Sequence, residues 1–190
     1  MNRYLISFII IVLTAVLYRK LKKTLKKKSS GYSVNLIDKY REMAKNENKT
    51  LVHCLHIGKT GGTAIKYAIG LKGQPYIDDK YIIVGHRHSF QLQDAKPGEK
   101  CFFVYRDPVD RFVSAFYSRK RKGAPRIYRE WNKGEKLAFE QFSTPNELAL
   151  ALNDSSENVQ KSAANAMGSI HHIRSSYWDW FGDKKYLLSR

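Results

Sequence analysis

The sequence is poor in cysteine and has no acidic residue in its first 30 positions. Two cysteines among 190 residues cannot build a disulfide-dense scaffold or a cysteine-rich zinc module. Cys54 and Cys101 both lie in apolar, strand-like runs, where we expect buried free thiols. A hydrophobic content of 43% with 13% aromatics excludes wholesale disorder. The length suits one ordinary domain with a real core.

Acidic residues are half as frequent as basic ones. The chain has 34 Lys and Arg against 17 Asp and Glu, a formal net charge of +17. Residues 1–30 carry part of this excess, but the rest of the chain is also basic. The balance predicts anionic partners, such as phosphates, sulfates, acidic glycans, nucleic acid or lipid headgroups. Nucleic acid is the least favoured of these, because aromatics interleave poorly with the basic run at 119–126.

Residues 4–18 form an uncharged, apolar segment followed by a basic run at 19–28. The segment is shorter than the roughly 20 residues of a full span, and no good cleavage site follows it. We expect an uncleaved signal anchor, a single-pass transmembrane helix, with the basic run on anionic headgroups. The positive-inside rule then places the body in the cytoplasm. The expected organisation is an anchor with its basic flank at 1–28, a linker with an amphipathic helix at 29–49, and a domain at 50–190.

Apolar runs and helical periodicity alternate along the rest of the chain. Runs rich in β-formers predict strands at 51–57, 81–84 and 101–105. Periodic segments predict helices at 34–45, 63–71 (capped by Thr63), 109–119, 138–152 and 155–167. This alternation is typical of an α/β fold, here a P-loop-like, mostly parallel sheet flanked by helices.

The loop after the first predicted strand reads Gly58-Lys59-Thr60-Gly61-Gly62-Thr63 and opens a helix. Glycines let backbone N–H groups approach an oxyanion, and the start of a helix adds partial positive charge. The Lys59 ammonium adds a full charge, and the threonines add hydroxyl donors. The nucleotide-triphosphatase loop needs a glycine where His53 stands, so this is a phosphate loop of a different pattern.

A second anion grip is predicted where the third strand ends. Arg106 stands at its carboxyl end, the edge where open α/β sheets bind ligands. Ser114 follows eight residues later on the next helix, and Asp107 is placed to orient Arg106 or Arg111. Arg106 and Ser114 together suit a second phosphate. Two grips on two strands predict a ligand with phosphates at both ends.

These two motifs together resemble those of sulfotransferases that use 3′-phosphoadenosine-5′-phosphosulfate. The resemblance is strongest to the Golgi carbohydrate group with the heparan sulfate and uronyl 2-O-sulfotransferases, and it spans about residues 51–180. There, a loop of the type I-P-K-T-G-G-T cradles the 5′-phosphosulfate, and R-D-P with a Ser eight residues after its Arg holds the 3′-phosphate. Gly58–Thr63, Arg106 and Ser114 match. Gly58 replaces the usual proline, which predicts a looser loop, and family members usually continue into a further strand and helix.

The resemblance also implies a base for the acceptor hydroxyl. Family members often carry Gly-His after the second strand, which His86 matches, and a free imidazole takes up a proton near neutral pH. His88 is the second candidate. His53 and His56 flank the first strand and are expected to be structural. His171 and His172 have no third ligand at zinc-like spacing, so no metal site is predicted.

The prediction is therefore a membrane-tethered sulfotransferase with Lys59 and His86 as its catalytic residues. The resemblance implies transfer from 3′-phosphoadenosine-5′-phosphosulfate, without a metal, to a carbohydrate or other hydroxyl acceptor such as an acidic glycan. It also implies a body in the Golgi lumen, against the charge bias. Two alternatives remain open: a nucleotide-dependent phosphotransferase, and a non-catalytic, membrane-tethered module that binds anions or glycans.

Overall fold

In a computed structural model of the chain, the described residues are 36–71, 73–182 and 184–188. Contacts among residues divide the chain into two compact units, residues 1–49 and 50–190. In the first unit, residues 36–46 are helical, where the sequence predicts a helix over 34–45. The predicted anchor at 4–18 and its basic flank lie outside the described residues. None of the described helices is long and apolar enough to cross a membrane.

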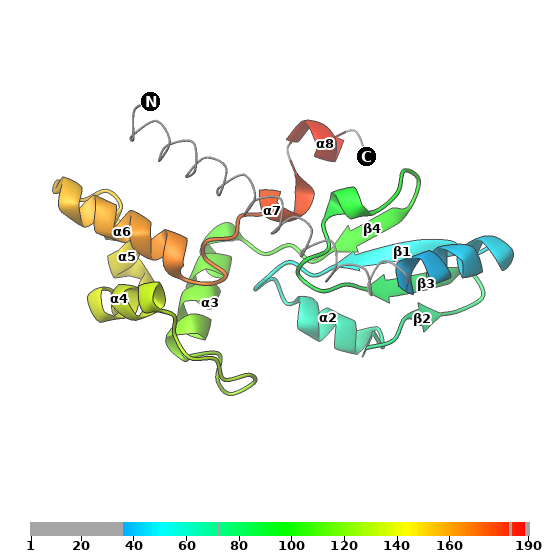
Figure 1. Cartoon of the computed structure of the whole chain (residues 1–190), viewed down its shortest axis with the longest axis horizontal. Coiled ribbons are helices and arrows are strands. Elements are labelled where there is room, and N and C mark those ends of the chain that lie inside the picture. The colour runs from blue at the N-terminus through cyan, green and yellow to red at the C-terminus, as the bar shows by residue number, and fades with distance from the viewer. Residues whose placement is uncertain (1–35, 72, 183, 189–190) are drawn as a thin grey trace, which may run out of the picture. The chain divides into compact units, whose positions relative to one another are not determined.

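The second unit contains a four-stranded sheet (Figure 1). The strands are β1 (Thr50–Leu55), β2 (Tyr76–Ile77), β3 (Tyr81–Gly85) and β4 (Lys100–Phe103), in the order β2-β3-β1-β4. β1 pairs in parallel with β3 and β4, while β2 pairs antiparallel with β3. The predicted α/β fold with a mostly parallel sheet is confirmed. The antiparallel edge strand is an addition, because two residues carry no readable periodicity.

The central strand β1 pairs with strands at both of its edges, and most of its side chains are buried. Cys54 lies opposite Gly85 of β3 and Phe102 of β4, and its thiol is free and buried, as predicted. β1 ends at Leu55, two residues before the predicted end. Ile57 nevertheless stays fully buried at 0% exposure, so its apolar side chain belongs to the core although its backbone belongs to the loop.

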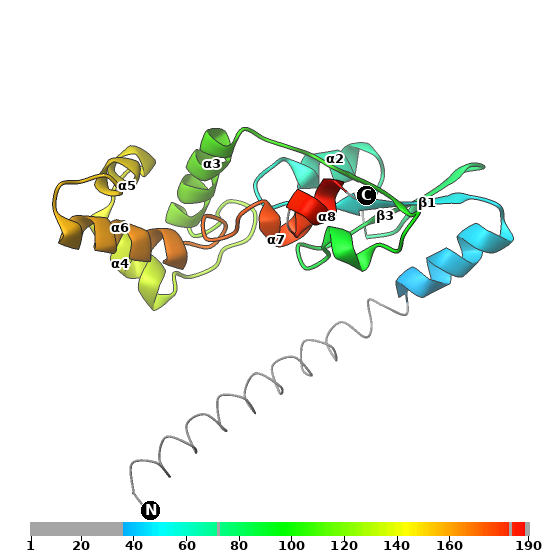
Figure 2. The same ribbon diagram turned by 90° about the horizontal axis from the view of Figure 1, so that it is seen from above.

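Two helices begin after the loops at the carboxyl edge of the sheet. α2 (Gly62–Ala68) follows β1 and runs along one side of the strands (Figure 2). Its N-cap is Gly61, in the left-handed conformation at φ 88°, so the predicted Thr63 cap is wrong. α3 (Pro108–Lys120) follows β4 with Pro108 in its first turn, as predicted. Asp107 caps α3, accepting from the backbone N–H groups of Val109 and Asp110.

The remaining helices build a second core beside α3. α4 (Lys133–Gln141), α5 (Pro145–Ala151) and α6 (Glu157–Ser169) lie together (Figure 1). The helix predicted over 138–152 is in fact two, because Phe142 is extended and Thr144 caps a new helix that begins with proline. After α6 the chain continues to α7 (Trp178–Phe181) and α8 (Lys184–Leu188). α7 contacts the 3₁₀ turn η1 (Leu92–Asp94), which lies between β3 and β4 in the chain. The second core is formed by Phe116, Ala138, Phe139, Phe142, Leu148, Ala151, Ala163, Ala166 and Ile170.

Candidate functional site

The carboxyl ends of β1, β3 and β4 meet at one edge of the sheet because these three strands are parallel. The loop after β1 carries Lys59, the loop after β3 carries His86 and His88, and the loop after β4 carries Arg106. Open α/β sheets bind ligands at this edge. The fold therefore brings the predicted anion loop, the candidate bases and the second arginine to the same edge.

The loop after β1 turns tightly around Lys59. Lys59 itself adopts φ 68° and Gly61 adopts φ 88°, so two residues of the loop are left-handed. The Thr60 hydroxyl donates to the carbonyl of Ile57 at 3.1 Å, which closes the turn from within. A β-carbon on Gly62 would meet the ring of His56 at 2.7 Å, so this position has no room for a side chain.

Positive charge converges on Lys59. Burial lowers the pKa of the Lys59 ammonium, and the charges of Arg121, Arg106 and Arg126 lower it further. All three charged neighbours that act on this ammonium are bases, and Lys59 is itself half-buried. Like charges held together repel one another, so an anion placed among them would be stabilised by all four. This is the electrostatic environment that a phosphate or phosphosulfate requires.

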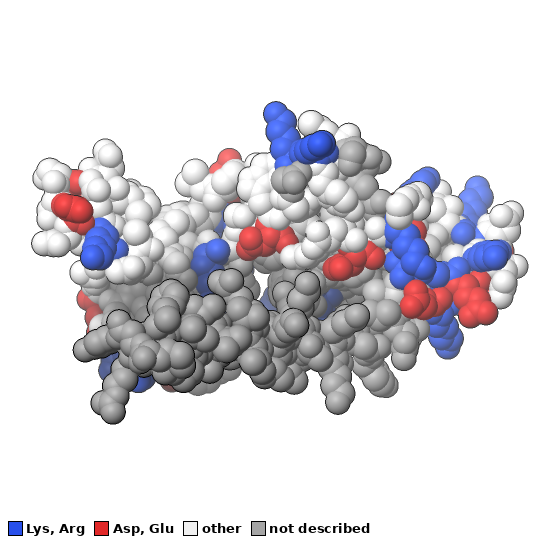
Figure 3. Space-filling view, turned by 45° about the horizontal axis from the view of Figure 1, so that its top comes forward, with Lys and Arg blue, Asp and Glu red and all other residues white. Residues whose placement is uncertain are grey.

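The group of basic residues that acts on Lys59 is a more specific feature than the net positive charge of the protein. The face drawn in Figure 3 carries Lys and Arg side chains beside Asp and Glu side chains. Excess charge by itself therefore does not mark a binding surface on that face. The group around Lys59 differs, because its bases come from the β1–α2 loop, the β4–α3 loop and the segment after α3.

The second predicted phosphate site, formed by Arg106 and Ser114, differs in part from the prediction. Arg106 lies three residues beyond the end of β4, not at its last residue, and its carbonyl accepts from the Tyr177 hydroxyl at 2.6 Å. Asp107 is occupied as the cap of α3 and does not orient an arginine as predicted. Ser114 is half-buried on α3, and within the described ranges no hydrogen bond connects it to Lys59 or Arg106.

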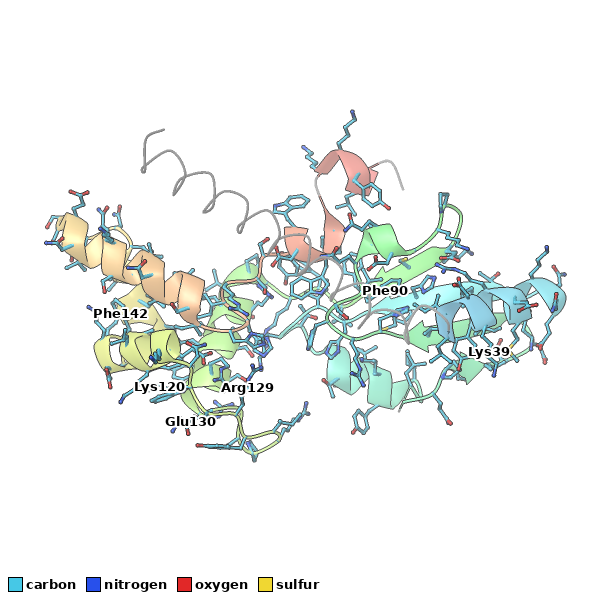
Figure 4. The ribbon with its side chains drawn as sticks, viewed as in Figure 1. Lys39, Phe90, Lys120, Arg129, Glu130 and Phe142 are labelled. Carbon is cyan, nitrogen blue, oxygen red and sulfur yellow. The ribbon has the colours of Figure 1, made fainter. Side chains whose placement is uncertain are left out.

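The loop between α3 and α4 supplies two of the bases. A buried ion pair joins Arg119 Nε to Glu135 Oε1 at 2.7 Å, and the same guanidinium donates to the carbonyls of Arg129 and Glu130. Figure 4 labels Arg129 and Glu130 where this loop returns toward α4. These hydrogen bonds attach the end of the loop to α3, and they thereby hold in place the segment that carries Arg121 and Arg126.

His86 is buried, with 5% of its surface exposed. Its Nε2 lies 2.8 Å from Nδ1 of His53, and Nε2 of His53 lies 2.9 Å from Oε2 of Glu99. An ionised carboxylate only accepts hydrogen bonds, so His53 carries its proton on Nε2 and, when neutral, accepts from His86. Phe90 stacks on His86 with ring centroids 3.5 Å apart and is labelled in Figure 4. Hydrogen bonds thus connect Glu99, His53 and His86 in a row, which agrees with the structural role predicted for His53.

His88 lies two residues further along and is exposed. Its Nδ1 is 2.8 Å from the carbonyl oxygen of His56. A carbonyl only accepts, so Nδ1 carries the proton and the lone pair of the neutral ring is on Nε2. Although the residue is exposed overall, its ring lies against that of His56, and this partial burial lowers the pKa of His88, while the hydrogen bond to His56 opposes the shift. His88 is therefore neutral at pH 7, with its tautomer set by the backbone.

His56 and His172 are also neutral at pH 7, because their pKa values are lowered. Burial and the neighbouring charge of His88 lower the pKa of His56 to about 4. Burial and His171 lower the pKa of His172 to about 3. The rings of His56 and His88 are 4.0 Å apart, centroid to centroid. Within the described ranges, no group of three or more His, Cys, Asp or Glu side chains is arranged to hold a metal ion.

Sequence reasoning missed Arg111 as a site residue. Arg111 is buried, and its Nε donates to the carbonyl of Gly58 at 2.9 Å. Gly58 is also buried, while the looser loop expected for glycine in place of proline stays a prediction. The available signal was spacing: Arg111 precedes the fully buried Ala115 by one helical turn and so occupies the inward side of α3.

The edge of the sheet thus offers a left-handed lysine loop, three arginines around it, and a neutral, exposed imidazole on the neighbouring loop. Such an arrangement can bind a doubly or multiply charged anion and accept a proton beside it. Comparisons of the chain with protein families, with curated proteins and with solved structures found no match.

Proposed function

We propose that the protein is a sulfotransferase that uses 3′-phosphoadenosine-5′-phosphosulfate as its donor. The observation that carries this proposal is that the parallel strands β1 and β4 bring the Lys59 loop and Arg106 to one edge of the sheet. The charges of Arg121, Arg106 and Arg126 accordingly help to lower the pKa of the Lys59 ammonium. A donor with phosphate groups on both sides of the nucleoside needs positive charge from more than one loop. The resemblance of the two motifs to the carbohydrate sulfotransferases supports the same reading.

The reaction assigns a role to each part of the site. Lys59 and the N–H groups of residues 58–63 would hold the 5′-phosphosulfate, and Arg106 with Ser114 would hold the 3′-phosphate. The acceptor hydroxyl oxygen forms a bond to sulfur as the bond from sulfur to the bridging phosphate oxygen breaks. The hydroxyl proton passes to a histidine, and the leaving group is 3′-phosphoadenosine-5′-phosphate. Lys59 stabilises the charge that develops on the leaving phosphate.

The base belongs to the loop after β3, where two histidines compete for the role. His86 is the sequence-based candidate, but its ring is buried and its Nε2 is bonded to His53. His88 is exposed, and its Nε2 holds the lone pair. Exposure of a neutral imidazole nitrogen to the acceptor favours His88 as the group that takes the proton. His86 would then support the loop through the hydrogen bonds that connect it with His53 and Glu99.

The deciding experiment is titration calorimetry with 3′-phosphoadenosine-5′-phosphate, with and without magnesium. Tight, magnesium-independent binding, weakened when the 3′-phosphate is removed from the ligand, is the expected result. Binding that needs magnesium and prefers a nucleoside triphosphate would favour a phosphotransferase. Binding of sulfated polymers without any nucleotide binding would favour a non-catalytic anion-binding module.

The acceptor and the membrane setting are also part of the proposal. A basic body suits an acidic carbohydrate acceptor, and residues 4–18 would tether the domain to a membrane. A screen of hydroxyl acceptors with radiolabelled donor identifies the acceptor class directly. Protease protection of the domain in sealed membranes distinguishes a lumenal from a cytoplasmic position.

A further inference from the structure

Lys59 has a backbone conformation that is rare for residues with a β-carbon. Its φ of 68° lies in the left-handed region, which costs a residue with a side chain about 1–2 kcal/mol relative to the right-handed form. Backbone strain of this kind persists only where the surrounding structure enforces it. The contacts next to Lys59 therefore hold the backbone from which its side chain extends.

Arg111 supplies the contact on one side. Its Nε donates to the carbonyl of Gly58, the residue before Lys59, at 2.9 Å. Its Nη2 donates to the carbonyl of His172 at 3.3 Å. The guanidinium lies 5.0 Å from the ring centroid of Tyr177 and 5.6 Å from that of Trp180. Arg111 thereby ties the loop to the segment between α6 and α7.

The side chain of His172 fits against the same point of the loop. A β-carbon on Gly58 would lie 3.2 Å from Nδ1 of His172 and 3.8 Å from the indole of Trp180. A contact of 3.2 Å is tighter than ordinary packing, so His172 occupies the space that a side chain at position 58 would need. Glycine at 58 and histidine at 172 are thus complementary.

We infer that Arg111, together with the Gly58–His172 contact, positions Lys59 for the anion, so that His172 supports the donor site through the loop after β1. Arg111 is a positioning residue and does not itself touch the anion. Its effect passes through the Gly58 carbonyl to the backbone of the next residue. The inference rests on the proposed function only for the identity of the ligand, a nucleotide with phosphate groups. The structural claim concerns the conformation of the loop.

The test measures loop order and nucleotide affinity in the full-length protein. Arg111→Lys keeps the charge but loses the paired donors of the guanidinium, so we expect affinity for 3′-phosphoadenosine-5′-phosphate to fall about tenfold. Amide hydrogen exchange in residues 57–62 should become faster in the same variant. Arg174→Lys, on the exposed surface of the same segment, is the matched control and should change neither measurement.

A reciprocal pair of variants tests the contact without removing a buried charge. Gly58→Ala should weaken nucleotide binding by roughly threefold or more, because its β-carbon displaces His172 or the loop. His172→Gly suits the left-handed backbone of that residue, φ 73°, and removes the ring. The double variant Gly58→Ala/His172→Gly should recover the affinity lost in Gly58→Ala alone.

The outcomes separate this inference from the proposed function. Unchanged exchange in residues 57–62 on Arg111→Lys would overturn it, and so would Gly58→Ala binding as the parent does. Failure of the double variant to recover would also overturn it. If the parent protein binds no nucleotide, exchange rates still decide: faster exchange in Arg111→Lys and Gly58→Ala, with recovery in the double variant, supports the positioning role while the sulfotransferase proposal fails.

Discussion

At the residue scale, Lys59 contributes both a charge and a backbone conformation, and the two can be separated by substitution. Glycine adopts φ 68° without strain, whereas alanine would keep the strain and lose the charge. A change of affinity in a glycine variant therefore reports on the ammonium alone. The same reasoning separates the two histidines of the β3 loop, since an amide can replace the bonded nitrogen of each ring.

Lys59→Gly is expected to lower affinity for 3′-phosphoadenosine-5′-phosphate about ten- to a hundredfold, the worth of one charge-assisted contact, and to abolish sulfuryl transfer. The melting temperature should stay the same or rise, because backbone strain is relieved. Calorimetry and thermal unfolding of the same samples check both parts. Lys59→Arg, which keeps the charge, is the control. Full transfer activity in Lys59→Gly would exclude the role.

His88→Asn should lower turnover by about 10²–10⁴-fold, the usual contribution of a positioned base. The asparagine amide can still donate to the His56 carbonyl, so donor affinity should change little. His86→Gln keeps a polar group near His53 and should retain most of the turnover. Initial rates at saturating donor make the comparison. Loss of turnover in His86→Gln with retention in His88→Asn would return the role to His86.

The pH profile of turnover gives a second test of His88. The base must be neutral, and burial lowers the pKa of His88 below its ordinary value of 6.5. Turnover should therefore be flat above pH 6.5 and should fall only as the pH drops through the lowered pKa. A profile that declines already between pH 8 and pH 7 would point to another group.

At the element scale, the segment that carries Arg121 and Arg126 depends on one buried ion pair between α3 and α4. Burial by itself would raise the pKa of Glu135, but hydrogen bonds from Arg119 and from the backbone N–H groups of His171 and Asn132 hold it at about 2. One carboxylate thus joins α3, the start of α4 and the segment after α6.

Glu135→Gln should lower the free energy of unfolding by about 3 kcal/mol, because the Arg119 charge is left buried without its partner. Urea unfolding followed by circular dichroism measures the change. Glu140→Gln is the matched control on the exposed side of α4, where the carboxylate lies 3.9 Å from Lys136, and should change stability by less than about 0.5 kcal/mol. Equal effects of the two substitutions would contradict the role of Glu135 in joining α3, α4 and the segment after α6.

At the scale of the whole molecule, neutral histidines make the fold sensitive to mild acid. The pKa values of His56 and His172 are about 4 and about 3 in the fold, against 6.5 in an unfolded chain. Between pH 6.5 and 4 the unfolded chain binds more protons, so stability is lost as the pH falls. The lowered pKa values of Glu130 and Glu135 add to this loss only below about pH 4.5, so the loss between pH 6.5 and 4.5 comes from the histidines.

The unfolding midpoint in urea is therefore expected to decrease from pH 7 to pH 5. His172→Asn keeps a residue that tolerates the left-handed backbone and removes one titrating group, so its midpoint should depend less on pH than that of the parent. Equilibrium unfolding of both proteins at the two pH values provides the measurement. A parent midpoint at pH 5 equal to that at pH 7 would contradict the expectation.

The sequence alone determined the alternation of strands and helices and the type of sheet. Apolar runs at 51–57, 81–84 and 101–105 are long enough to identify strands, and Pro108 identifies the start of α3. The placement of the Lys59 loop was also readable, because glycine, lysine and threonine have local reasons to stand between a strand and a helix. Boundaries were less readable, since Gly61 and Thr144 cap the starts of α2 and α5 through backbone conformations that composition does not reveal.

Only the tertiary structure decided which of these residues meet. The arginines around Lys59 come from segments 47 to 67 positions later in the chain, and no local pattern states such a distance. The same holds for Arg111, whose partners are Gly58 and His172, and for His86, whose burial depends on Phe90 and His53. Local chemistry follows from neighbouring residues along the chain. The burial of His86 and the hydrogen bonds of His53 and Arg111 follow from packing between residues far apart in the chain. Such residues meet because parallel strands bring the loops after them to a common edge.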